Sequence, residues 1–364
     1  CTFTNTKLDT IVVYKVAAGG DATFPFTSTI PGASNFSITT ANGTGITYFN
    51  DVQPGTYAIS ETVPAGWTLA DVVCSNGDDP ASITLAAGET VACTFANEKN
   101  DTIIVVKRTV GGDGSFSFTS DIPGASSFTL TTTNNVARTS FTVPPDATYN
   151  ISESVPAGWD LTSAVCSNGD TPDSVYVGAG ETVGCVFTNT ERGRLTIVKQ
   201  AVGGDGNFQF LSPQFGVFNL NTVGGTAQTS VPNLPPGTYS VDEIGWPAGW
   251  DPTSATCSDG SNPNSIALAA GEHVTCTFTN TKRGSINVVK QAVGGDGVFA
   301  FSSNTLTPAS FNLTTTAGSA QRDFTDLVPG SYDVAETLPA DWHLDNIQCQ
   351  HAPNSVGGID YGAN

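Results

Sequence analysis

The sequence predicts an all-β protein made of four tandem antiparallel β-sandwich domains. Three observations favour this fold class. One short segment recurs four times, as YKVAAGGDATFPF, VKRTVGGDGSFSF, VKQAVGGDGNFQF and VKQAVGGDGVFAF. Apolar and polar residues alternate with a period of two between turns that contain Gly and Pro, as β-strands require. The composition also favours strands and turns over helices, because the 364 residues include 39 Gly and 21 Pro and only 13% are charged.

The length of the repeat sets the domain organisation. Its lysines are Lys15, Lys107, Lys199 and Lys290, which lie 92, 92 and 91 residues apart. A unit of this size can bury its own core, so we expect separate domains in tandem and not the turns of a solenoid. We assign repeat 1 to residues 8–99, repeat 2 to 100–191, repeat 3 to 192–282 and repeat 4 to 283–364. Roughly six to eight short strands are expected in each repeat. The polar connections between repeats are short, which predicts a semi-rigid rod.

The acidic composition excludes several kinds of partner. The chain has 13 Lys+Arg against 33 Asp+Glu, a net charge of -20, which repels nucleic acids and anionic membranes. No stretch approaches the roughly 20 apolar residues of a membrane-spanning helix. The three histidines follow no catalytic or ligand pattern, so we expect no cofactor, no metal and no turnover enzyme. The absence of Met indicates a processed chain or a segment of a longer one.

Three polar residues in each repeat share a face with apolar residues. In the first strand Lys15 lies on the same face as Val13, because residues two apart point to the same side of a strand. By the same rule Glu61 lies on the apolar face of YAISE, and Asn97 lies on the apolar face of VACTFAN. The equivalent residues are Lys107, Glu153 and Asn189 in repeat 2, Lys199, Glu243 and Asn280 in repeat 3, and Lys290 and Glu336 in repeat 4.

Two interpretations explain these inward-facing polar groups, since burying a lone charge costs several kcal/mol. The first is an ion pair of Lys and Glu capped by Asn, or strands frayed enough to reach water. The second is chemical. Desolvation lowers the pKa of the lysine amine and raises the pKa of the carboxyl group, so a neutral amine can attack the Asn carbonyl while protonated Glu polarises it. The product is a Lys–Asn isopeptide bond, formed with loss of ammonia.

Each repeat resembles the Cna-B-like, prealbumin-like domains of bacterial surface adhesins and SpaA-type pilins. The resemblance rests on the Lys of the first strand, on YxxxE followed by PxGW as in YAISETVPAGW, and on the Asn that ends the last strand in FANEK, FTNTE and FTNTK. It implies an immunoglobulin-like sandwich with an internal isopeptide bond that the glutamate promotes. The implied bonds are Lys15–Asn97 promoted by Glu61, Lys107–Asn189 promoted by Glu153, and Lys199–Asn280 promoted by Glu243. Repeat 3 departs from the pattern by one extra residue after Glu243, and Trp67, Trp159, Trp250 and Trp342 stand where the family commonly has Tyr.

The eight cysteines predict disulfides in an oxidising, extracellular compartment, because none has the C-x-x-C spacing of a zinc site. Three pairs are separated by 19 residues at equivalent places in the repeats. They are Cys74 with Cys93, Cys166 with Cys185, and Cys257 with Cys276. Cys1 and Cys349 are left over.

The first residues have the sequence of a closing strand, since CTFTNTK occurs both at residues 1–7 and at residues 276–282. Repeat 4 ends in HAPNSVGGIDYGAN, where a closing strand would be expected. We therefore expect residues 1–6 of one copy to complete repeat 4 of another by donor-strand complementation. The same register brings Cys1 to Cys349, and Asn5 to Lys290 and Glu336. Because this contact is head-to-tail, its repetition builds an open filament.

The sequence thus predicts a structural subunit of an extracellular filament or pilus-like fibre, whose partners are copies of itself. Two alternatives concern the chain ends: the chain is a window of a longer array whose next strand follows Asn364, or Cys1 is a lipidated N-terminus. The competing function is the stalk of a cell-surface adhesin that presents a binding domain for a surface or matrix ligand. Isopeptide formation would be a single-turnover reaction, so neither function makes the chain an enzyme.

Overall fold

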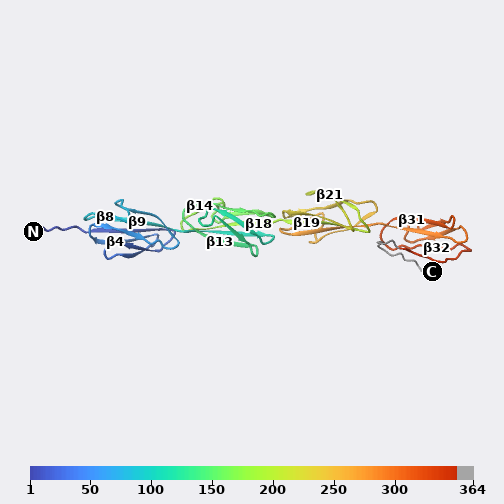
Figure 1. The fold of residues 1–364 in the computed structure, drawn as a ribbon, viewed down its shortest axis with the longest axis horizontal. Helices are drawn as coiled ribbons and strands as arrows, with labels where there is room; N and C mark the ends of the chain where they lie inside the picture. The colour runs from blue at the N-terminus through green and yellow to red at the C-terminus, as the bar shows by residue number, and fades with distance from the viewer. Residues whose placement is uncertain (351–364) are drawn as a thin grey trace. The chain divides into compact units, whose positions relative to one another are not determined.

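The computed structural model describes residues 1–350, and these residues form strands, turns and irregular segments without a helix. No part of this range could therefore cross a membrane as a helix. The chain divides into two compact units, Cys1–Glu191 and Arg192–Asn364, each containing two repeats. Figure 1 shows the strands of each repeat gathered into a group of their own. The predicted fold class, all-β with tandem sandwich domains, is confirmed.

Repeat 1 contains two sheets and a short ribbon. The larger sheet has the strand order β4-β1-β9-β7, the smaller sheet β3-β2-β6, and the ribbon pairs β5 with β8. The strands are β1 (Asp9–Ala18), β2 (Thr23–Ser28), β3 (Asn35–Thr39), β4 (Thr44–Val52), β5 (Gly55–Tyr57), β6 (Ile59–Glu61), β7 (Trp67–Cys74), β8 (Ile83–Leu85) and β9 (Thr90–Lys99).

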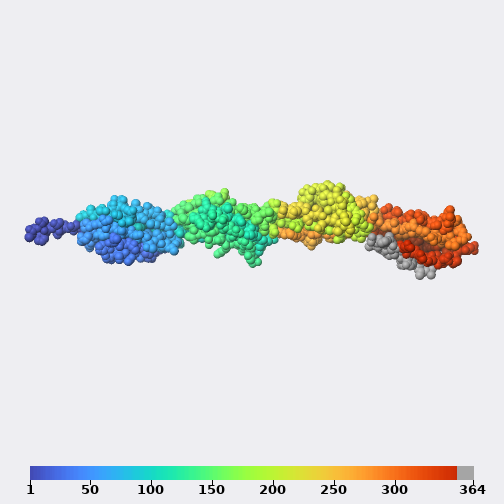
Figure 2. All heavy atoms as spheres, in the orientation of Figure 1, coloured from blue at the N-terminus to red at the C-terminus, as the bar shows by residue number. Residues whose placement is uncertain are grey.

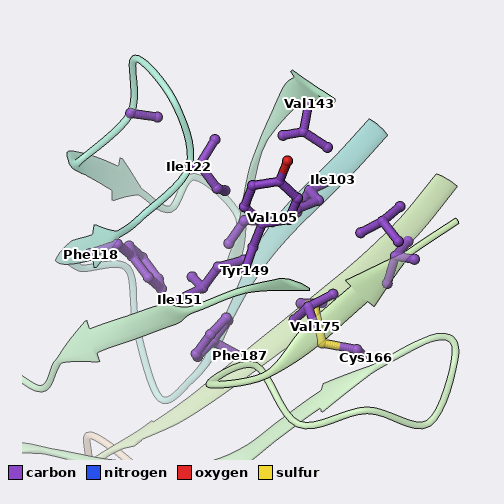
Figure 3. Packing of buried hydrophobic residues seen from close by; sticks show 14 of the residues in the cluster. Ile103, Val105, Phe118, Ile122, Val143, Tyr149, Ile151, Cys166, Val175 and Phe187 are labelled. Atoms are coloured by element: carbon purple, nitrogen blue, oxygen red, sulfur yellow. A yellow bond between two sulfur atoms is a disulfide. The ribbon is translucent and has the colours of Figure 1, made fainter. Parts of the chain in front are cut away.

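Repeat 2 has the same plan, with sheets β13-β10-β18-β16 and β12-β11-β15 and the ribbon β14-β17. Its strands are β10 (Asp101–Val110), β11 (Ser115–Ser120), β12 (Ser127–Thr131), β13 (Val136–Val143), β14 (Ala147–Tyr149), β15 (Ile151–Ser154), β16 (Trp159–Cys166), β17 (Val175–Val177) and β18 (Thr182–Glu191). The core lies between the sheets, where Val105 and Phe187 of one sheet meet Phe118 and Ile151 of the other (Figure 3).

Repeat 3 follows this plan in the second unit, with sheets β22-β19-β27-β25 and β21-β20-β24 and the ribbon β23-β26. Its strands are β19 (Gly193–Val202), β20 (Asn207–Ser212), β21 (Gly216–Asn221), β22 (Thr226–Leu234), β23 (Gly237–Tyr239), β24 (Asp242–Gly245), β25 (Trp250–Cys257), β26 (Ile266–Leu268) and β27 (His273–Lys282).

Repeat 4 has fewer strands in the described part of the chain. It forms a pair, β28-β31, and a sheet, β30-β29-β32. The strands are β28 (Gly284–Gln291), β29 (Val298–Ser302), β30 (Ser310–Thr314), β31 (Ser319–Leu327) and β32 (Ala335–Thr337). Residues 351–364 of the predicted repeat lie outside the described residues.

The structure differs from the sequence prediction in strand number and in one pairing. Repeats 1 to 3 each have nine strands, because the segment around Ala58 crosses from the ribbon to the smaller sheet and counts as two strands, β5 and β6. Antiparallel pairing was expected throughout, but β1 runs parallel to β9, β10 to β18 and β19 to β27. First and closing strands can run parallel because they are far apart in the chain and need no tight turn between them.

Residues 1–8 form no strand and are exposed. They extend away from the body of repeat 1, in dark blue in Figure 2. Phe3 is 93% exposed, whereas its equivalents Phe95, Phe187 and Phe278 are buried in closing strands. The segment therefore carries the sequence of a closing strand without the environment of one.

Candidate functional site

The predicted polar trio of repeat 2 is brought together in the core. Lys107 of β10, Glu153 of β15 and Asn189 of β18 come from three strands, and their side chains are fully buried or nearly so. Lys107 Nζ donates to Asn189 Oδ1 at 2.5 Å and lies 3.2 Å from Glu153 Oε2. Asn189 Nδ2 donates to Glu153 Oε1 at 2.6 Å. The three side chains thus form a closed ring of polar contacts inside an apolar core.

Repeat 1 has the same arrangement with a wider separation of the charges. Lys15 Nζ lies 2.6 Å from Asn97 Oδ1 and 3.7 Å from Glu61 Oε2. It also donates to the backbone carbonyl oxygen atoms of Val16 and Phe95, both at 2.9 Å. Asn97 Nδ2 donates to Glu61 Oε1 at 2.6 Å. The amine therefore has its full set of three hydrogen-bond acceptors in the core.

The extra residue of repeat 3 leaves its trio intact. A register shift between Gln209 and Phe210 in the β20–β24 pair absorbs the insertion, so Phe210 still pairs with Glu243. Lys199 Nζ lies 2.6 Å from Asn280 Oδ1 and 3.3 Å from Glu243 Oε2. Asn280 Nδ2 donates to Glu243 Oε1 at 2.8 Å.

Burial shifts the pKa values of these groups in opposite directions. Desolvation lowers the pKa of Lys15 to about 8, although the Glu61 carboxylate opposes the shift. Desolvation raises the pKa of Glu61, against the opposing effects of Lys15 and Asn97. The lysine pKa is likewise lowered and the glutamate pKa raised, by burial first, in repeats 2 and 3. Burial therefore brings the two pKa values closer together and lowers the cost of transferring a proton from the amine to the carboxylate.

One contact of the lysines was not anticipated from the sequence. Each ammonium lies over the ring of a Phe in the following strand, at 4.2 Å from the centroid for Phe24, 4.3 Å for Phe116, 4.4 Å for Phe208 and 4.3 Å for Phe299. The recurring signal was available, because the same Phe follows every GGD turn.

The glutamate also faces a different atom from the one expected. We expected it at the Asn carbonyl, but in the structure Glu153 Oε1 accepts a hydrogen bond from Asn189 Nδ2. The carbonyl oxygen instead accepts from Lys107. The glutamate thus contacts both the lysine amine and the amide nitrogen of the asparagine.

In the described part of repeat 4, only the lysine and the glutamate of the trio come together. Lys290 Nζ lies 2.6 Å from Glu336 Oε1, and the two side chains are 12% and 10% exposed. Within residues 1–350 no asparagine lies against this pair, and Asn5 is in the exposed N-terminal segment.

Disulfides connect each closing strand to its antiparallel neighbour. Three of the four predicted pairs are present, and each joins residues that face each other in the sheet register. They are Cys74–Cys93, Cys166–Cys185 and Cys257–Cys276. Cys1 and Cys349, the predicted pair between copies, are free and exposed. Within the described residues, no group of three or more His, Cys, Asp or Glu could hold a metal ion.

The sequence matches the family described as Prealbumin-like fold domain four times, over residues 11–99, 103–191, 195–282 and 286–363. Solved structures similar to this chain include the Bacillus anthracis TIE protein, with 16% identity, 96% of this chain and 73% of that chain covered, and a TM-score of 0.35. The major pilin subunit of Bacillus cereus has 13% identity, with 76% of this chain and 100% of that chain covered and a TM-score of 0.29. The full-length major pilin SpaD from Corynebacterium diphtheriae has 11% identity, with 76% of this chain and 98% of that chain covered and a TM-score of 0.28. No curated protein sequence matches the chain.

Proposed function

The chain belongs to the prealbumin-like fold domain family in each of its four repeats, and we propose that it is a structural subunit of an extracellular, pilus-like filament. Isopeptide bonds and disulfides reinforce its repeats, and copies join head-to-tail by donor-strand complementation. The observation that carries this proposal is the buried Lys–Glu–Asn trio. It is complete in three repeats, and in the fourth the described residues supply only Lys290 and Glu336, for which Asn5 is the proposed partner.

Isopeptide formation within repeats 1 to 3 follows from the contacts of the trio. The ammonium group first gives a proton to the glutamate, a step whose cost the opposite pKa shifts reduce. The free Nζ of Lys107 then attacks Cγ of Asn189, and the bond from Cγ to Nδ2 breaks as the new bond forms. Glu153 passes its proton to the departing nitrogen, which it already contacts.

The products balance without a buried charge. The new amide keeps one hydrogen from the lysine amine, and the leaving group departs as ammonia. One proton of the original ion pair remains on Glu153, which ends as a neutral acid and suits its raised pKa. Relief of a buried ion pair therefore accompanies bond formation.

Strand donation is supported by the missing neighbour of β28. The equivalent strands β1, β10 and β19 each lie between two neighbours, but β28 pairs only with β31 in the described residues. Ile286 and Val288 are half-buried, whereas their equivalents Leu195 and Ile197 are fully buried. An unpaired edge beside exposed apolar side chains is a template for an added strand.

The internal repeats define the register of the added strand. In repeat 3, Ile197 pairs with Cys276, Lys199 with Phe278, and Ala201 with Asn280. Transferred to the joint between copies, this register pairs Val288 with Cys1, Lys290 with Phe3, and Ala292 with Asn5. Asn5 would complete the trio of Lys290 and Glu336, and Cys1 would reach Cys349.

Burial of Phe3 supplies part of the driving force, because burying one Phe side chain contributes about 1.5–3 kcal/mol. The covalent bonds then make the joint irreversible. The free cysteines and the internal disulfides both fit an oxidising extracellular location.

Deletion of residues 1–6 tests strand donation. The shortened protein should stay monomeric under conditions in which the parent forms disulfide-linked ladders on non-reducing gels. A second variant, Phe3→Ser, keeps Cys1 and Asn5 and loses only the apolar side chain, and it should slow assembly. Fibres that persist after the deletion would refute strand donation.

A further inference from the structure

Two turns meet at the joint between repeats 1 and 2. The turn at Gly19 and Gly20 follows β1, and the turn at Ala179 and Gly180 precedes β18. A Cβ atom added to Gly19 would lie 2.8 Å from the carbonyl oxygen of Ala179, and one added to Gly180 would lie 2.7 Å from that of Gly19. The backbones of the two repeats are therefore in direct contact, with no space for a side chain between them. The contact makes Gly necessary at both positions, which also have φ values of +86° and +77°.

The linker at this joint is held by backbone and side-chain hydrogen bonds. Gly180 N donates to the carbonyl oxygen of Lys99 at 3.0 Å, which ties the turn of repeat 2 to the end of β9. Asp101, fully buried, accepts from Glu181 N at 3.2 Å. Thr102 N donates to the carbonyl oxygen of Glu181 at 2.9 Å. These bonds fix the direction of the chain as it passes from β9 of repeat 1 into β10 of repeat 2.

The segment before repeat 1 is held in the same way. Asp9, equivalent to Asp101 and also buried, accepts from Gly88 N at 2.5 Å and from Glu89 N at 3.1 Å. Thr10 N donates to the carbonyl oxygen of Glu89 at 3.0 Å. Lys7 packs along Gly88, because a Cβ atom on that glycine would lie 2.8 Å from Lys7 Cδ. The N-terminal segment therefore joins repeat 1 at the same position at which the linker from repeat 1 joins repeat 2.

Equivalents of both turns also occur in repeats 1 and 4. Repeat 1 has the turn of Ala87 and Gly88, equivalent to Ala179 and Gly180, and Ala87 is exposed. Repeat 4 has Gly294 and Gly295, equivalent to Gly19 and Gly20. A Cβ atom on either of these two glycines would meet nothing within 4 Å. The turns of repeat 1 and repeat 4 are therefore equivalent to the two turns that meet at the internal joint.

We propose that a second copy of this chain docks here, with its Gly294–Gly295 turn against the Ala87–Gly88 turn, beside the donated strand. The inference rests on the proposed strand donation and adds a second contact surface to it. Only Lys7 and Leu8 separate the donated strand from β1, so the joint between copies reproduces the joint between repeats 1 and 2. The filament then has no hinge at its seams.

The experiment uses Ala87→Trp in the full chain, compared with Ala81→Trp at the other end of β8. Both alanines are exposed, so both variants should melt like the parent. Ala179, the equivalent of Ala87, is partly buried at the internal joint, so a Trp at residue 87 should crowd the proposed contact. Overpacking of that kind should weaken self-association about tenfold or more. Association is measured by sedimentation in reducing buffer, before covalent bonds accumulate, and the Ala81→Trp variant should associate like the parent.

The outcomes separate this inference from the proposed function. If Ala87→Trp associates as strongly as Ala81→Trp while deletion of residues 1–6 abolishes association, strand donation stands and the turn contact is wrong. If the deletion leaves association intact, the proposed function itself fails. If Ala87→Trp melts lower than the parent, Ala87→Lys replaces it, and normal association of a stable Ala87→Lys variant overturns the turn contact.

Discussion

Replacing Asn189 by Ala removes the electrophile of repeat 2 while keeping Lys107 and Glu153. The proposed bond would connect residues 82 positions apart in the chain. In the chain-entropy relation for crosslinks, a closed loop of this length stabilises the folded state by about 4.5 kcal/mol. For a domain of this size that corresponds to a fall of about 20 °C or more in the melting temperature of repeat 2.

The loss of hydrogen bonds alone gives a smaller effect. If Lys107 and Asn189 only touch, the substitution leaves buried polar groups less satisfied and costs about 1–3 kcal/mol. The two effects can be separated after unfolding. A crosslinked chain stays compact in denaturant, so the reduced and boiled parent should migrate faster than Asn189→Ala on a denaturing gel.

Calorimetry of the full chain measures the first effect, since repeat 2 has its own core and should melt as its own transition. Asn219→Ala is the matched control, because Asn219 is exposed on β21 and lies outside the trios and the donated strand. Equal gel mobility of Asn189→Ala and parent, with a melting temperature lowered by only a few degrees, would refute the crosslink in repeat 2.

Two further predictions concern the acid and base chemistry. Glu153→Gln should slow bond formation in repeat 2 about a hundredfold or more, because Gln cannot accept the lysine proton and return it to the leaving nitrogen. Time-resolved mass spectrometry after refolding measures the rate of bond formation, and repeats 1 and 3 serve as internal controls. In repeat 1, the reacting pair of Lys15 and Glu61 must hold one proton between them. Its rate should therefore be level from the raised pKa of Glu61 up to about pH 8, the lowered pKa of Lys15, and fall on both sides. A rate that keeps rising above that pH would show that the glutamate is not the acid.

The sequence predicted the inward direction of the polar residues because strand parity is exact over short distances. Lys107, Glu153 and Asn189 each lie two residues from an apolar core position, and a period of two leaves them no other face. The family resemblance then joined three separate strands into one site. Disulfide pairs such as Cys166–Cys185 were predictable for a similar reason, since they recur at one spacing.

Other features could not be predicted, because they depend on tertiary contacts. Periodicity carries no information on strand direction, so the parallel pairing of β10 with β18 was missed. Asp9 and Asp101 begin their strands and look like ordinary turn residues. In the structure, however, both are buried against the turn that comes just before the closing strand of the same repeat. The atom that Glu153 faces depends on the side-chain torsion angles of Asn189, which no sequence pattern specifies.

The central claim is that buried polarity in this chain is relieved by bond formation. The most direct measurement is the intact mass of the reduced monomer, in which each isopeptide bond lowers the mass by about 17 Da through loss of ammonia. The account predicts three such losses, one each for the trios of Lys15, Lys107 and Lys199. A mass equal to that of the unmodified sequence would contradict it.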